Sequence, residues 1–150
     1  MNKLYKTFAA LFFGMVLFAS CEKEPTEDLT NIIKEDLGYL PVIASFTLKS
    51  PATTTVQPGT QATFDLRYWS EGALSKVEFW MIQGENETLL TEQAYVPAYS
   101  TLSRTDSLIF NYTVPANLQP GAAFSIQSRV YNEGLEEYPV SSSVALTVAR

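Results

Sequence analysis

Hydrophobic and polar residues alternate over most of the chain after position 41, in short stretches separated by Pro, Gly, Asn and Ser. A period of two is typical of β-strands with one buried face, because successive side chains point to opposite sides of a sheet. Six stretches alternate cleanly, and their inward-facing residues are predicted to be Ala44, Phe46, Leu48; Ala62, Phe64, Leu66, Tyr68; Val77, Phe79, Met81; Leu108, Phe110, Tyr112, Val114; Phe124, Ile126, Ser128, Val130; and Val144, Leu146, Val148. A seventh stretch within residues 89–95 alternates less regularly, as suits an edge strand. Residues 41–150 are therefore predicted to form an all-β antiparallel sandwich of about seven strands.

The N-terminal residues follow a different pattern. A basic start with Lys3 and Lys6 leads into an uncharged apolar run over residues 8–18. This order is typical of a secretory signal peptide. The run is shorter than the roughly 20 apolar residues that a helix needs to cross a bilayer. We therefore expect residues 1–20 to direct export and then to be removed.

The apolar run ends in Leu17-Phe18-Ala19-Ser20-Cys21, and Cys21 is the only cysteine of the chain. These residues resemble the lipobox of bacterial lipoproteins, in which small residues precede a cysteine that receives lipid before cleavage. Phe18 stands where that family usually has leucine. The resemblance implies acyl chains, palmitate among them, on Cys21 and attachment to the outer membrane. The alternative is an ordinary signal peptide followed by an unmodified cysteine.

Residues 21–40 are predicted to form an acidic tether, because they hold six acidic residues against two lysines. Apolar residues recur at helical spacing in the second half, at Leu29, Ile32, Ile33 and Leu37. This spacing predicts a short helix over residues 27–37, and a disordered linker is the alternative because so short a helix is marginal alone. The acids just after Cys21 resemble an export signal of some Gram-negative lipoproteins, which favours the cell surface over the periplasmic face.

Charge and residue types narrow the function. The chain has no histidine, and most acid–base devices, thiol nucleophiles and zinc sites need histidine or a free cysteine. We therefore expect no enzyme and no cofactor. Without residues 1–20 the chain holds 16 acidic and 8 basic residues, a formal net charge of −8, which disfavours nucleic acid as a partner.

Two stretches carry a family resemblance. Residues 118–134 contain a Pro-Gly turn, an aromatic residue that opens a strand at Phe124, and Asn132 before a glycine turn. With Tyr138-Pro139-Val140-Ser141 they resemble the end of a fibronectin type III or related bacterial Ig-like domain, and residues 75–80 resemble strand C of bacterial Ig-like modules. The resemblance implies an Ig-like sandwich but no particular function, since many functions share this fold.

Aromatic residues supply the candidate binding surface. If Val77 and Phe79 point inward, Trp80 points outward, and on the neighbouring strand Arg129 and Tyr131 do the same. An exposed aromatic platform of this kind suits the apolar face of a sugar ring. Two further aromatic residues, Trp69 and Tyr138, are expected to extend it, and Trp69 is out of phase with the inward set of its strand. The alternative is that the tether helix or the connection over residues 97–105 covers Trp80.

Acidic residues supply a weak calcium candidate. In a sandwich of this topology, the turns that hold Glu71, Glu133, Glu136 and Glu137 lie at the same end. Calcium takes six to eight oxygen ligands and accepts such loops. The sequence has no Asp-rich calcium signature, so a solvated acidic end is the alternative and no metal is expected.

Two functions fit these features. The first is an accessory lipoprotein that binds polysaccharide, similar to the Ig-like modules of starch-utilisation-type outer-membrane systems. The second is a structural or assembly subunit of an outer-membrane protein complex. In both cases Cys21 provides the membrane attachment.

Overall fold

The computed structural model describes residues 39–150, so the predicted signal peptide, Cys21 and the predicted helix over residues 27–37 lie outside the described residues. Among residues 39–150 there is no helix that is long and apolar enough to span a membrane. The strands are β1 (Val42–Ser50), β2 (Thr55–Val56), β3 (Gln61–Trp69), β4 (Leu74–Gln83), β5 (Asn86–Ala94), β6 (Asp106–Thr113), β7 (Ala123–Asn132) and β8 (Val140–Val148).

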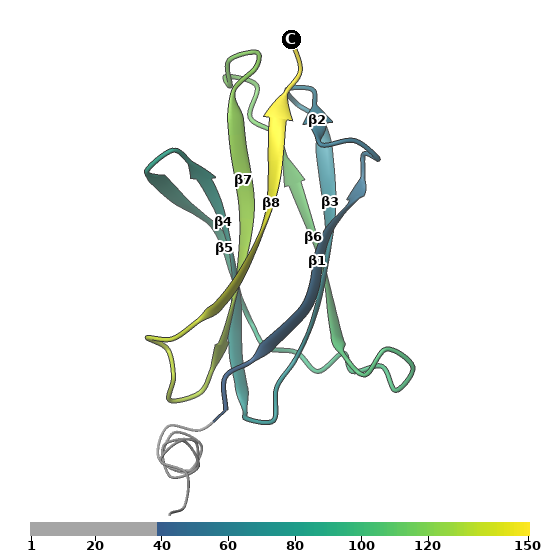
Figure 1. The fold of residues 1–150 in the computed structure, drawn as a ribbon, viewed down its shortest axis with the longest axis vertical. Coiled ribbons are helices and arrows are strands. Elements are labelled where there is room, and N and C mark those ends of the chain that lie inside the picture. Colours follow the sequence, from purple (N-terminus) through teal and green to yellow (C-terminus); the bar gives the residue numbers. More distant parts are fainter. Residues whose placement is uncertain (1–38) are drawn as a thin grey trace, which may run out of the picture. The chain divides into compact units, whose positions relative to one another are not determined.

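These strands form two facing sheets (Figure 1). One sheet has the order β1-β3-β6, and the other has the order β2-β8-β7-β4-β5. This is the A-B-E and G-F-C-C′ arrangement of an Ig-like sandwich, with β2 as a short addition beside the last strand. The predicted fold class is confirmed, and β5 lies at the edge of its sheet as predicted. The two-residue strand β2 was not predicted, and it pairs with β8 in parallel.

The core is a group of aromatic rings between the sheets. Phe79 of β4 stacks on Phe110 of β6, with centroids 4.1 Å apart and planes 5° from parallel. Phe64 of β3 packs beside Phe110, and Phe46 of β1 packs beside Phe64. Because Phe79 and Phe110 belong to different sheets, their stack joins the two layers directly.

Among the residues predicted to face inward, only Ala44 faces outward instead. A register irregularity in the β1–β3 pairing lies between Ile43 and Ser45. It turns Ala44 outward and leaves Ile43 packed against the core. All the other predicted inward residues are buried or partly buried against the core, despite further register irregularities in β1 and β4.

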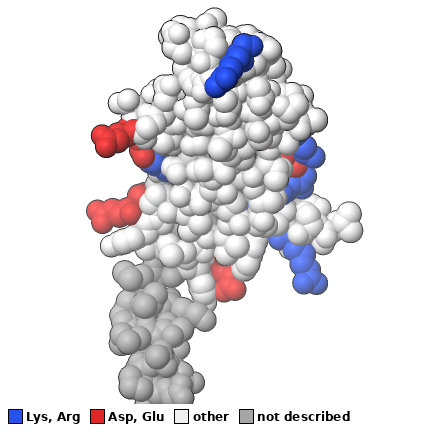
Figure 2. All heavy atoms as spheres, turned by 45° about the horizontal axis from the view of Figure 1, so that its top comes forward, with Lys and Arg blue, Asp and Glu red and all other residues white. Residues whose placement is uncertain are grey.

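Charged side chains are few on the face shown in Figure 2, where acidic and basic residues project mainly from opposite flanks. Most outward positions of β1, β6 and β8 hold Ser, Thr or Asn. The C-terminal residue 150 lies at the opposite end of the sandwich from the start of β1 (Figure 1). The C-terminus is therefore remote from the end of the sandwich at which the described chain begins.

The stack across the sheets makes a stability prediction. Phe79→Ala should lower the free energy of unfolding by about 3–5 kcal/mol, because it removes a fully buried ring and leaves a cavity. Urea unfolding followed by circular dichroism measures this loss. Ile109→Ala is the control, since Ile109 lies on the outer side of β6 and is 49% exposed. Equal losses of unfolding free energy in the two variants would contradict the conclusion that the buried Phe79 ring stabilises the fold.

Candidate binding site

Trp80, Arg129 and Tyr131 do meet on the outer face of the five-stranded sheet, whereas Trp69, which was expected to extend this surface, belongs to the three-stranded sheet. In the pairing of β4 with β7, Trp80 lies opposite Gln127, and Glu78 lies opposite Arg129. The guanidinium of Arg129 covers the ring of Trp80 at 4.5 Å from its centroid. Tyr131 is only 7% exposed, and the ammonium of Lys76 lies 4.9 Å from its ring centroid. The residues are therefore adjacent as predicted, but the expectation of an exposed flat platform is wrong.

A buried carboxylate organises this face. Glu78 is 6% exposed and accepts hydrogen bonds from Lys76 Nζ at 2.7 Å, Trp80 Nε1 at 2.8 Å and Tyr131 Oη at 2.7 Å. Burial alone would raise the pKa of Glu78, but the hydrogen bonds from Lys76, Tyr131 and Trp80 outweigh it and lower the pKa to about 2. Burial and the bond to Glu78 raise the pKa of Tyr131 to about 12.

The neighbouring polar groups are also engaged. Arg129 donates to Gln127 Oε1 and to Glu87 Oε2, both at 2.7 Å, and Lys76 also donates to Glu92. The polar ends of the side chains on this face therefore form hydrogen bonds with one another. A ligand bound here would have to break existing bonds, which disfavours this face as a binding site.

The three-stranded sheet repeats this design on its own outer face. Asp65 of the central strand β3 is 5% exposed and forms ion pairs with Arg67 at 2.8 Å and Lys49 at 3.3 Å. Burial opposes ionisation of Asp65, but hydrogen bonds from Arg67 and Lys49 lower its pKa. Each sheet thus has one buried acidic residue on its outer face, and neighbouring basic side chains form ion pairs with it.

Two other predicted groups lie elsewhere. Tyr138 is 58% exposed in the connection between β7 and β8. The four glutamates of the calcium candidate, Glu71, Glu133, Glu136 and Glu137, are exposed. Within residues 39–150, no group of three or more acidic, cysteine or histidine side chains is placed to hold a metal ion. The structure therefore does not assemble the calcium site.

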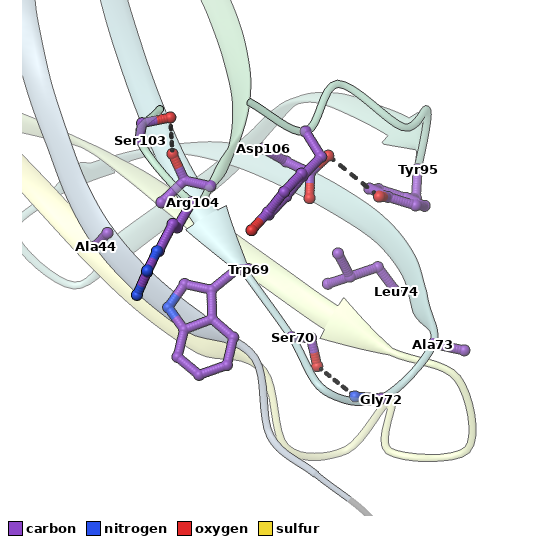
Figure 3. A pocket seen from close by; sticks show the side chains of 12 residues that line it. Ala44, Trp69, Ser70, Gly72, Ala73, Leu74, Tyr95, Ser103, Arg104 and Asp106 are labelled. Carbon is purple, nitrogen blue, oxygen red and sulfur yellow. Dashed lines mark hydrogen bonds between the residues drawn. The ribbon is translucent and has the colours of Figure 1, made fainter. Parts of the chain in front are cut away.

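A pocket of about 800 Å³ opens at the end of the sandwich where β3 ends and β4 begins (Figure 3). Its walls come from the β3–β4 turn and from the connection between β5 and β6. The lining residues are Ala44, Trp69, Ser70, Gly72, Ala73, Leu74, Tyr95, Tyr99, Ser103, Arg104, Thr105 and Asp106. Of the residues predicted to bind ligand, only Trp69 lines it.

Aromatic rings give the pocket its apolar surface. Trp69 is 36% exposed and Tyr99 is 58% exposed. Tyr95 is held deeper, where its ring meets that of Tyr68 edge to face. Burial and the nearby Asp106 carboxylate raise the pKa of Tyr95. The pocket therefore offers accessible aromatic faces that the outer face of β4 and β7 lacks.

Asp106 fixes the wall that carries these rings. Its carboxyl group is buried, and Oδ1 accepts hydrogen bonds from Tyr95 Oη at 3.2 Å and from the Ala98 amide at 2.8 Å. Farther along the connection, the backbone of Ser100 pairs with that of Thr105. The long connection is thus held by specific bonds at both ends.

Arg104 stands at the mouth of the pocket. Its backbone has a φ of 55°, in the left-handed region that residues other than glycine and asparagine rarely adopt. The Arg104 amide closes the turn by donating to the Ser100 carbonyl at 2.8 Å. Its exposed side chain is directed toward Trp69 (Figure 3).

The opposite wall is held by a clasp formed by Asn132, Ser70 and Tyr39. Asn132 is 2% exposed, and its side-chain amide donates to the Tyr39 carbonyl and to Ser70 Oγ. Ser70 Oγ also accepts from the Gly72 amide at 3.0 Å. A Cβ at Gly72 would lie 2.8 Å from the Asn132 side-chain nitrogen, so any other residue there would have to displace the Asn132 side chain.

Sequence reasoning missed most of this pocket. Tyr95, Tyr99 and Arg104 come from the connection between β5 and β6, and Asp106 is the first residue of β6. The conformation of this connection depends on hydrogen bonds between residues several positions apart. The one available signal was the length of the connection together with its aromatic residues. Long connections that carry aromatic side chains at the end of a sandwich often form binding sites.

No family model matches the chain, and no curated protein matches it. Among solved structures, it is similar to a chitin binding domain from Burkholderia pseudomallei, with a TM-score of 0.45 and 10% identity over 63% of this chain and 56% of that one. It is also similar to the sporulation control protein Spo0M from Bacillus subtilis, with a TM-score of 0.44 and 9% identity over 75% and 49% of the two chains. The C-terminal domain of wzt gives a TM-score of 0.44 and 16% identity over 73% and 74%. The chain spans about half the length of the first two, and none of these likenesses carries an argument about its function.

The environment of Glu78 makes a prediction about pH. Because its folded-state pKa is lowered from 4.5 to about 2, its contribution to stability is present above pH 4.5 and is lost as the pH falls toward 2. Glu78→Gln should therefore lose less free energy of unfolding than the wild type between pH 5 and pH 2, by on the order of 2 kcal/mol. Urea unfolding at a series of pH values measures the difference. Glu85→Gln, in the exposed β4–β5 turn, is the control and should follow the wild type.

Proposed function

We propose that this protein is an extracytoplasmic lipoprotein whose sandwich is a non-catalytic module that binds glycan. Lipid on Cys21 would attach it to the outer membrane, at the cell surface in preference to the periplasmic face. The signal-peptide pattern of residues 1–20 and the lipobox-like residues before Cys21 support the anchor. The acidic residues that follow Cys21 support the surface location.

The observation that carries glycan binding is the pocket at the end of the sandwich. Its volume of about 800 Å³ lies within the range of about 300–1,000 Å³ usual for small-ligand sites. Exposed rings of Trp69 and Tyr99 stand beside the polar groups of Ser70 and Ser103. An apolar ring face beside hydrogen-bonding groups matches a sugar ring, which has apolar faces and a polar rim.

Binding without catalysis is supported by the residues of the same pocket. Hydrolysis of a glycosidic bond usually needs a pair of carboxyl groups, one on each side of the bond. Among residues 39–150 only one carboxylate, that of Asp106, lines the pocket, so no second carboxyl group faces it across a bound glycosidic bond. The chain also lacks histidine, the most common general base.

The anchor is tested by lipid labelling. Cells that express the full chain and are fed an alkyne analogue of palmitate should yield labelled protein in the membrane fraction. Cys21→Ser should abolish the label and release the protein, because Cys21 offers the only thiol. Label that persists in Cys21→Ser, or an unlabelled wild type, would contradict the proposal.

Glycan binding is tested by affinity electrophoresis of the detergent-solubilised mature protein across a panel of polysaccharides. At least one glycan should retard the wild type. Trp69→Ala should weaken that retardation at least about tenfold, because stacking of an aromatic ring contributes on the order of 1–2 kcal/mol.

Tyr138→Ala is the matched control, since Tyr138 is exposed but lies outside the pocket. It should migrate as the wild type does. Unchanged migration of the wild type on every glycan, or an equal effect of the two substitutions, would overturn the assignment.

An assembly role is the second candidate, and the free edge of β6 favours it. From Ser107 to Thr113 this strand has no charged residue and no proline, the usual protections of a sheet edge. A second hollow of about 520 Å³ lies beside it, lined in part by Leu90, Ile109 and Tyr112. Crosslinking in cells from a photoreactive residue at Ile109 would favour this role if it captured one defined protein and glycan retention were absent.

A further inference from the structure

The end pocket holds a cation that forms no ion pair with a carboxylate of residues 39–150. Among residues 39–150, Lys49, Arg67, Lys76 and Arg129 each lie within 3.3 Å of a carboxylate oxygen. Arg104 takes part in none of these ion pairs. Arg150, at the opposite end of the sandwich, is the other basic residue of this range that forms no such ion pair.

The backbone of Arg104 adds a second observation. A φ of 55° strains a residue that has a Cβ, and glycine or asparagine would close the same turn with less strain. Strain that the surrounding structure maintains at a pocket mouth points to a role for the side chain. The strained turn directs the guanidinium toward Trp69 and into the pocket (Figure 3).

We infer that the pocket binds a carboxylate-bearing sugar residue, with the Arg104 guanidinium pairing with the sugar carboxylate and the Trp69 ring packing against the sugar. This inference rests on the glycan-binding function proposed above. It adds the charge of the ligand, and it assigns Arg104 as the residue that selects it.

The geometry of the guanidinium suits this ligand. Its planar set of N–H donors forms two parallel hydrogen bonds with a carboxylate, which are stronger than bonds between neutral groups. The exposed position of Arg104 leaves these donors open to a ligand. Trp69, toward which Arg104 points, offers the apolar surface for the ring that bears the carboxylate.

Asp106 fits the same ligand at the other side of the pocket. Within residues 39–150 both hydrogen bonds to the Asp106 carboxylate go to Oδ1, so Oδ2 is left to accept from a sugar hydroxyl. The Tyr95 hydroxyl and the Ala98 amide offset part of the Asp106 charge, which reduces its repulsion of an anion. A ligand with hydroxyl donors on one side and a carboxylate on the other matches this pair of residues.

The experiment is a titration of the ¹⁵N-labelled mature chain, carrying Cys21→Ser so that it needs no detergent. The probes are galacturonate, glucuronate and N-acetylneuraminate, each compared with its uncharged methyl ester. Because the chain has two tryptophans, its spectrum should show two indole N–H signals. The Trp69 signal should shift on binding, whereas that of Trp80, which is bonded to Glu78, should not.

At least one acid should bind at least about tenfold more tightly than its ester, a difference of about 1.4 kcal/mol. Arg104→Gln should remove this preference and leave the affinity for the ester unchanged. Arg104→Gly should remove it too, while the melting temperature stays equal or rises because the strained φ suits glycine. A loss of affinity together with a gain in stability would separate a role in binding from a role in folding.

Arg150→Gln is the matched control, since Arg150 is the C-terminal residue at the opposite end of the sandwich (Figure 1). It should bind every probe as the wild type does. Equal affinity for acids and esters, or an unchanged preference in Arg104→Gln, overturns the inference and leaves glycan binding standing. If no acid binds here while a neutral polysaccharide is retained in electrophoresis, the inference alone fails. If nothing binds in either experiment, both proposals fail.

Discussion

The stack of Phe79 on Phe110 is the contact on which the arrangement of the molecule depends. It joins β4 of the five-stranded sheet to the edge strand β6 of the three-stranded sheet, and other core rings pack beside it. Once these positions point inward, the alternation of the strands places every second residue on an outer face. The buried acids Glu78 and Asp65 lie on these outer faces as a consequence.

The two outer faces and the end pocket have opposite chemical character. On the faces, each buried carboxylate is matched by donors from its own sheet, so the polar groups bond to one another. In the pocket, the donors of Arg104 and part of the Asp106 carboxylate are left without such partners within the described residues. The buried carboxylates of the two outer faces are already paired within their sheets. The polar groups that remain able to bind a ligand therefore lie at the pocket end.

The sequence predicted the sandwich and its core well, because burial on one side of a strand leaves a direct trace as a period of two. The prediction of Ala44 was wrong because a bulge shifts the phase and leaves no such trace. Alternation also placed Trp80, Arg129 and Tyr131 on one face correctly. The prediction that they form an exposed platform was wrong, because the Arg129 side chain folds over the Trp80 ring on the neighbouring strand.

The pocket itself was almost invisible in the sequence. Trp69 was picked out as an aromatic residue out of phase, but the residues opposite it come from a connection with no periodic pattern. Its shape depends on bonds such as those of Asp106 to Tyr95 and Ala98, which join positions several residues apart. Local patterning carries no information about contacts of this kind.

The clasp formed by Asn132, Ser70 and Tyr39 has a mechanical consequence. It joins the first described residue of the chain to the turn that forms one wall of the pocket. If the protein is tethered through residues before Tyr39, a pull on a captured ligand would pass to the tether through this short route. This route lies at the end of the sandwich opposite to the C-terminus, so the two sheets would carry little of the force (Figure 1). The domain would then hold its ligand under tension without its core being strained.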